Sequence, residues 1–108
     1  MTGVESVRRY NWAVDVEIRG IEWDDWNEDH IAEHGLSRTD VEQVCHGRRW
    51  LDATREGRAR VVGRTSAGRI IVVILARLDG GRYYCVTAFP ATGSTPRDFL
   101  DQERRGES

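Results

Sequence analysis

An uninterrupted apolar stretch, Ile70–Ala76, constrains the fold of this chain more than any other feature. Turn residues flank it on both sides: Ser66-Ala67-Gly68 precedes it, and Asp79-Gly80-Gly81, a strong hairpin sequence, follows it. A strand without a polar face must be covered on both faces, so we expect this one at the centre of a sheet. Its neighbours are then the segments Arg58–Thr65 and Arg82–Phe89, each joined to it by a hairpin.

The segment before this sheet has the pattern of a short helix. Asp24 or Asp25 is suited to cap its N-terminus, because a carboxylate can accept hydrogen bonds from the first backbone amides. The helix is expected to run to about His34 and to end at Gly35, which can adopt the left-handed conformation that stops a helix.

A second helix and a C-terminal helix are indicated by their caps. Ser37, with Asp40 three residues later, has the pattern of a capping box, and this helix should reach about Cys45. Thr95, with proline at the next position, is suited to cap a final helix that runs to about Glu103.

The remaining segments complete a single α+β domain spanning residues 1–108. The alternating segment Trp12–Ile18 and the short segment Trp50–Ala53 predict two further strands. Residues 1–11 and 104–108 are expected to form a flexible leader and tail. The expected architecture is an antiparallel sheet of three to five strands with two N-terminal helices and one C-terminal helix. We expect the helices to cover one face of the sheet and to leave the other face open.

Arginine supplies all 16 basic side chains of the chain, against 18 aspartates and glutamates. The net charge of −2 does not indicate a nucleic-acid binder. The distribution is uneven, however, because arginines concentrate between residues 48 and 82 and create a local basic field. Guanidinium groups bind phosphate and carboxylate but cannot shuttle protons at neutral pH, so any mechanism here must work without lysine.

The two cysteines, Cys45 and Cys85, are expected to be free thiols in a reducing compartment, which favours a cytoplasmic protein. The N-terminal segment Met1–Trp12 lacks the apolar stretch of a signal peptide. The stretch Ile70–Ala76 is too short to cross a bilayer. We therefore expect no membrane association.

Three arginines of one predicted strand, Arg58, Arg60 and Arg64, have the same parity and should project from the same face. Such a face is either ordinary solvated surface, which is common on antiparallel sheets, or an anion-binding site. The pattern alone favours the solvated surface. Glu56, in the preceding turn, is the nearest acidic residue that could move a proton.

Metal and thiol chemistry receive little support. His30 and His34 lie four residues apart and could share a metal, but no third ligand follows at a recognised spacing, so no metal or other cofactor is expected. Cys45 and His46 are sequence neighbours and point apart on a helix, which argues against a nucleophilic pair.

Aromatic side chains of the last strand, Tyr83, Tyr84 and Phe89, could stack on bases of single-stranded RNA if one face of that strand is open. Packing within the sheet is the expected role of at least two of the three. The four tryptophans are expected to serve packing.

Taken together, several segments resemble the BrnT branch of the RelE/ParE-like toxins of bacterial toxin–antitoxin systems. Ile21–Asn27, followed by Glu33–Ser37, is similar to the family's Trp-Asp element, its His-Gly step and the start of its second helix. Arg58–Val73 is similar to the family's strand–turn–strand core, and Val86–Thr92 to its Ser-Ala-Arg segment before the last helix. The resemblance spans about residues 21–103.

The resemblance implies a RelE-like fold and a ribonuclease that stops translation. It also implies a cognate antitoxin that neutralises the toxin, and contact with operator DNA only through the toxin–antitoxin complex. By position, Arg58 matches the arginine that begins the family's first long strand, His34 the histidine of the His-Gly step, and Thr87 the family's serine. The chain departs from the family at Glu33, where the family has lysine, and at Phe89, where it has arginine.

The implied reaction is a metal-independent transphosphorylation of RNA, free or on the ribosome. Arg58 and Arg60 would stabilise charge on the phosphate, and His34 or Glu56 would move the proton. The expected RNA-binding residues beyond these are Arg64, Arg77, Arg82, Tyr84 and Thr87.

Two rival interpretations remain open. One is a catalytically degenerate member of the same fold that binds nucleic acid, or acts as a co-repressor, only in complex with a partner protein. The other is a domain of unrelated function whose arginine face is solvated surface.

Overall fold

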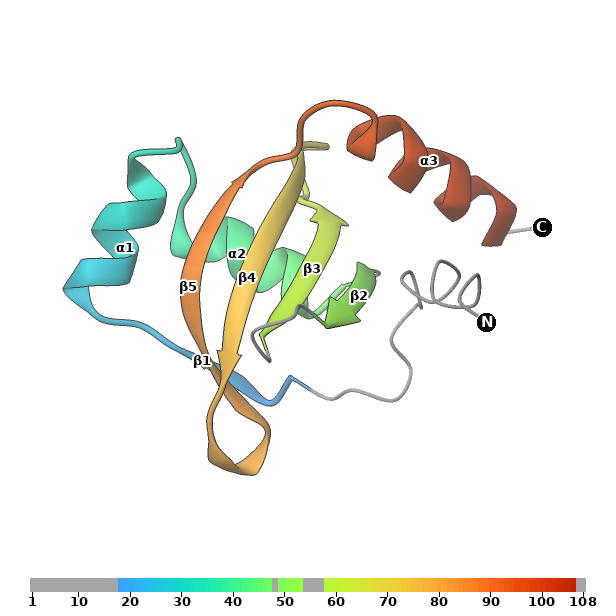
Figure 1. Ribbon diagram of the computed structural model, residues 1–108. Coiled ribbons are helices and arrows are strands. Elements are labelled where there is room, and N and C mark those ends of the chain that lie inside the picture. Colours follow the sequence, from blue (N-terminus) through green and yellow to red (C-terminus); the bar gives the residue numbers. More distant parts are fainter. Residues whose placement is uncertain (1–17, 48, 54–57, 107–108) are drawn as a thin grey trace.

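A five-stranded sheet with the strand order β1-β5-β4-β3-β2 forms the centre of the domain (Figure 1). The computed structural model describes residues 18–47, 49–53 and 58–106, so the predicted leader, Glu56 and most of Trp12–Ile18 lie outside the described residues. The strands are β1 (Gly20–Glu22), β2 (Arg49–Ala53), β3 (Ala59–Arg64), β4 (Ile70–Arg77) and β5 (Arg82–Pro90); the helices are α1 (Asp25–Ala32), α2 (Arg38–Cys45) and α3 (Thr95–Gly106). The predicted α+β class, with two N-terminal helices and one C-terminal helix, is confirmed.

The apolar stretch forms the central strand β4, as predicted. It pairs antiparallel with β3 on one side and with β5 on the other. Alternate residues point to opposite faces, so Ile71, Val73 and Leu75 enter one core cluster while Val72 enters another. Because both faces are covered, a strand without polar positions is stable only at this place in the sheet.

One face of the sheet is covered by α1 and α2. Ile31 from α1 and Val41 and Val44 from α2 are completely buried against the strands. Figure 1 shows α2 passing behind the strands and α1 lying beside β5. At about 25 cal/mol per Å² of apolar surface, each of these side chains contributes roughly 1.5–3 kcal/mol.

The opposite face is covered in part by α3, so the prediction that all helices lie on one face was wrong. Phe99 of α3 is completely buried against Trp50, Val62 and Val72, and its ring meets the Trp50 ring edge to face at 5.2 Å. The reason is that Trp50, Val62 and Val72 form an apolar patch on this face that needs a partner. The helix also extends to Gly106, beyond the predicted end at Glu103, so residues 104–106 are helical rather than a loose tail.

Both N-terminal helices begin at the predicted caps. Asp24 caps α1 and Ser37 caps α2, each in a capping box with the residue three positions later. The first helix ends at Ala32, slightly before the predicted His34, and Gly35 follows with φ of +78°. That left-handed conformation is one that glycine adopts without strain.

An irregularity in β5 changes which of its side chains share a face. Leu75 pairs with Cys85, but Ile74 pairs with Thr87, so Val86 is an extra residue in the ladder. As a result Tyr84 and Thr87 lie on the same face, although regular alternation would separate them. β1 adds a parallel pair at the β5 edge, which the sequence pattern did not predict. None of the helices in the described segments has the length and apolarity needed to span a bilayer.

Candidate functional site

A row of three side chains crosses the sheet on the face that carries α3. Arg60 of β3 pairs in register with Ile74 of β4, which pairs with Thr87 of β5, and on its other side Arg60 pairs with Asp52 of β2. Arg60, Ile74 and Thr87 are half-buried. Two strand spacings separate Arg60 from Thr87, which corresponds to roughly 10 Å. The row is adjacent to the Val62–Val72 pair on which α3 packs.

Arg60 differs from the other arginines of the predicted site in its environment. Within the described parts of the chain its side chain has no ion pair and no hydrogen bond, although it is half-buried. Arg58 is exposed, directly precedes β3 and is two residues from Arg60, which extends the cationic side of the row. A half-buried guanidinium that forms no ion pair is suited to bind an anion.

His34 lies at the β5 edge of the same face. Its exposed ring meets the ring of Phe89 at a centroid distance of 6.3 Å. Phe89 pairs with Val72, in the row next to that of Thr87. The fold therefore places Arg60 and Thr87 in one row, and His34 beside the next row through its contact with Phe89.

Tyr84 shares this face with Thr87, but its hydroxyl is already engaged. It donates to both carboxylate oxygens of Asp24, the cap of α1, at 3.1 Å each. Partial desolvation, followed by this hydrogen bond and the negative charge of Asp24, raises the pKa of Tyr84 above its ordinary value. The phenol therefore remains a protonated donor at neutral pH and cannot act as a base.

The other predicted arginines have separate positions. Arg64 forms an ion pair with Glu103 at 2.9 Å and so ties β3 to α3. Arg82 forms an ion pair with Glu22 at the start of β5. Arg77 pairs with Tyr83, whose side chain is buried on the α2 side, so Arg77 projects from the opposite face to Arg60. The structure thus does not bring Arg77 to the row.

The described residues form neither a metal-binding group of histidines nor a reactive thiol. His30 and His34 contact each other edge to face at 5.6 Å, but no group of three or more metal-ligating side chains occurs in the segments described. Cys45 and Cys85 are buried free thiols, and burial is the main cause that raises the pKa of each to about 12. Neither thiol is therefore a nucleophile at neutral pH.

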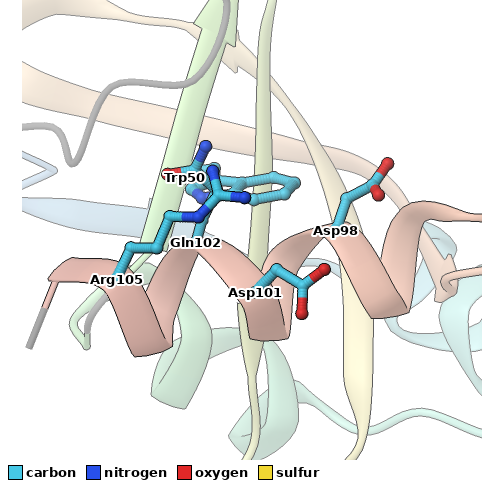
Figure 2. Close-up of a pocket in the computed structure, with 5 residues that line it drawn as sticks. All are labelled: Trp50, Asp98, Asp101, Gln102 and Arg105. Carbon is cyan, nitrogen blue, oxygen red and sulfur yellow. The ribbon is translucent and has the colours of Figure 1, made fainter.

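A feature that sequence reasoning missed is a hollow of about 190 Å³ between α3 and β2 (Figure 2). It is lined by the indole of Trp50 and by polar side chains of one helix face: Asp98, Asp101, Gln102 and Arg105. Because these four polar residues are spaced three or four apart, the sequence could have predicted that they share one face of a helix. It gave no sign that Trp50 of β2 lies beneath that face. The hollow is small and contains none of the predicted site residues.

Comparisons of this chain with protein-family models, with curated proteins and with solved structures found no match.

Proposed function

We propose that this protein is the toxin of a type II toxin–antitoxin system, similar to BrnT, and that it cleaves RNA without a metal. The observation that carries the proposal is the half-buried Arg60, which has no ion pair among the described residues and lies in the same row as Thr87. The α+β arrangement agrees with the fold that the family resemblance implies.

The proposed reaction is an internal transphosphorylation of RNA. The 2′-hydroxyl oxygen forms a bond to the adjacent phosphorus, and the bond from phosphorus to the 5′-oxygen breaks. The products are a 2′,3′-cyclic phosphate and a free 5′-hydroxyl. The proton lost by the 2′-hydroxyl is transferred to a base, and the leaving 5′-oxygen gains a proton.

The residues have distinct roles in this reaction. Arg60, assisted by Arg58, stabilises the negative charge that develops on the phosphate oxygens. His34 moves the proton, and Thr87 donates a hydrogen bond that orients the phosphate. Glu56, the other proton carrier expected from the sequence, lies outside the described residues. A cognate antitoxin neutralises the protein, and operator DNA is contacted only in their complex.

A second candidate, a catalytically degenerate module that acts in complex with a partner, is favoured by one contact. Phe89 stands where the family has an arginine, and its ring lies against His34. An apolar ring there supplies no charge for the transition state. This module would bind RNA or a partner protein through the same face without cleaving RNA.

The test is cleavage of a 5′-labelled single-stranded RNA, together with cell-free translation, by the wild type, Arg60→Ala, Arg58→Ala and Arg97→Ala. Arg97, an exposed arginine of α3, is the charge-matched control. We expect Arg60→Ala to lower the cleavage rate about 10²–10³-fold, which is typical of losing one donor to a developing oxyanion. Arg97→Ala should cleave normally.

Two outcomes would count against the proposal. A folded Arg60→Ala protein that cleaves at the wild-type rate would remove this site. A wild type that binds RNA through Arg60 but neither cleaves it nor stops translation would favour the degenerate module.

A further inference from the structure

A row of aromatic rings runs along one side of α1 and into the sheet. The Trp26 indole stacks on the His30 ring at 5.0 Å with an interplanar angle of 8°, and His30 meets His34 edge to face at 5.6 Å. His34 in turn meets Phe89. Trp26 is 60% exposed, more than the other exposed large apolar side chains of the described segments. We call Trp26, His30 and His34 the aromatic ridge.

The completely buried contacts of α1 come from residues outside the ridge. The helix packs through Asn27 and Ile31, which are completely buried, and Asp24 caps its N-terminus. The ridge residues Trp26 and His30 lie about 100° around the helix from these two buried residues, and the exposed Trp26 indole adds little to folding. A large exposed aromatic next to further rings is typical of a surface that binds a partner.

A row of carboxylates runs parallel to the ridge. Asp25, Asp29 and Glu33 each precede a ridge residue by one position, are spaced four residues apart and are exposed. Within the segments that the structure describes, none of the three has an ion-pair partner. Three unneutralised carboxylates repel a polyanion such as RNA and attract cations.

We propose that the aromatic ridge and its acidic row form a docking surface for a cationic segment of a partner protein. A guanidinium of that segment stacks on the open face of the Trp26 indole, in a cation–π contact, and donates hydrogen bonds to Asp25 or Asp29. The next cation meets Glu33 and the ring of His34.

The spacing of the rows indicates how the cations are arranged in the partner. Residues four apart on a helix are separated by about 6 Å along its axis. Arginines four apart on a partner helix, or two apart on an extended strand, repeat at about the same distance. A single amphipathic segment can therefore follow both rows along α1.

This docking surface shares only His34 with the residues of the proposed RNA cleavage, and the inference does not rest on that cleavage. The two surfaces have opposite charge and meet at the contact of His34 with Phe89. A partner segment on α1 that reaches His34 would also block access to the RNA-binding row.

The test measures anisotropy of a labelled, alanine-based helical peptide with arginines four residues apart. The matched probes are the same peptide with glutamates in place of the arginines, and a labelled oligouridine. Protein variants are Trp26→Ala, Asp29→Asn and Asp79→Asn, the last being an equally charged change in the exposed β4–β5 turn. Denaturant unfolding of each variant first establishes that it is folded.

Of the three probes, we expect only the arginine peptide to bind the wild type. Trp26→Ala should weaken binding about tenfold, as expected for a central interface aromatic. Asp29→Asn should weaken it severalfold and reduce its dependence on salt, while Asp79→Asn changes neither.

Three results would overturn the proposal. The first is no binding of the arginine peptide at millimolar concentration. The second is an equal loss of affinity in Asp79→Asn and Asp29→Asn, which would indicate nonspecific attraction. The third is binding of oligouridine that Trp26→Ala abolishes, which would make the ridge an RNA surface. Because no RNA cleavage is measured, an inactive nuclease leaves each of these results interpretable.

Discussion

The side-chain amide of Asn27 donates a hydrogen bond to the backbone carbonyl oxygen of Cys85 at 3.0 Å. The same amide nitrogen donates to the carbonyl of Glu22, and the amide oxygen accepts from the backbone of Asp24. Glu22 is the last residue of β1 and pairs with Tyr84 of β5. Cys85 is the next residue of β5, so Asn27 binds its carbonyl where the pairing with β1 ends. One completely buried side chain thus joins α1, β1 and β5.

Replacement of Asn27 by alanine should therefore be costly. The substitution removes these hydrogen bonds and leaves two backbone carbonyls without them, so the free energy of unfolding should fall by roughly 2–4 kcal/mol. Urea unfolding followed by circular dichroism measures the change. Trp26→Ala, one position away but exposed, is the control and should stay within about 0.5 kcal/mol of wild type. Equal effects of the two changes would contradict the role assigned to Asn27.

The ion pair between Arg64 and Glu103 should help to hold α3 on the sheet. A double-mutant cycle with Arg64→Ala and Glu103→Ala should give a coupling of about 0.5–1 kcal/mol, because Arg64 is 43% exposed and its charge is screened. The coupling, measured by urea unfolding, should decrease at high salt. A coupling of zero at low salt would mean that Phe99 alone anchors the helix.

Unfolding stability should decrease at alkaline pH. The folded-state pKa values of Cys45 and Cys85 are raised from 9.0 to about 12 by burial, and that of Tyr84 is raised as well. Because the folded state holds these protons more tightly, the stabilisation is complete below pH 9 and is lost as the pH rises towards 12. Each thiol contributes a slope of roughly 1.4 kcal/mol per pH unit in that window. Urea unfolding between pH 7 and pH 11 measures how the free energy of unfolding depends on pH. Cys45→Ala should make this dependence less steep. An unchanged dependence in that variant would contradict the raised pKa of Cys45.

The position of Arg77 separates it from the proposed reaction. Arg77→Ala should leave RNA cleavage within about twofold of wild type, because its side chain lies on the opposite face of the sheet from Arg60. The same labelled RNA assay measures this. A loss as large as that of Arg60→Ala would place the RNA on the other face.

Local sequence patterns predicted the elements well, because their causes are local. The cap at Ser37 with Asp40 depends on neighbouring residues, and so does the hairpin at Asp79–Gly81. The apolar stretch required cover on both faces, which correctly placed β4 at the centre. The parity of Arg60 and Arg64 likewise placed both side chains on one face.

The arrangement of the site depended on contacts that no local pattern contains. The partner of Arg64 is 39 residues away on α3, and the packing of that helix is decided by a patch built from three strands. The parallel pairing of β1 with β5 joins segments about 60 residues apart. Nothing in the sequence distinguished Arg60 from Arg64, Arg77 and Arg82. In the structure, Arg60 is half-buried and has no partner among the described residues, whereas Arg64 and Arg82 form ion pairs and Arg77 projects from the opposite face.

The extra residue Val86 allows β5 to lose one residue without exchanging its faces. Deletion of Val86 would let Thr87 follow Cys85 directly and still pair with Ile74, so Thr87 and Phe89 would keep the face that Arg60 occupies. A second deletion in the regular strand would have no extra residue to absorb it and would turn the residues after it over to the opposite face. Relatives that lack only this residue would therefore share both the fold and the chemistry beside the same arginine.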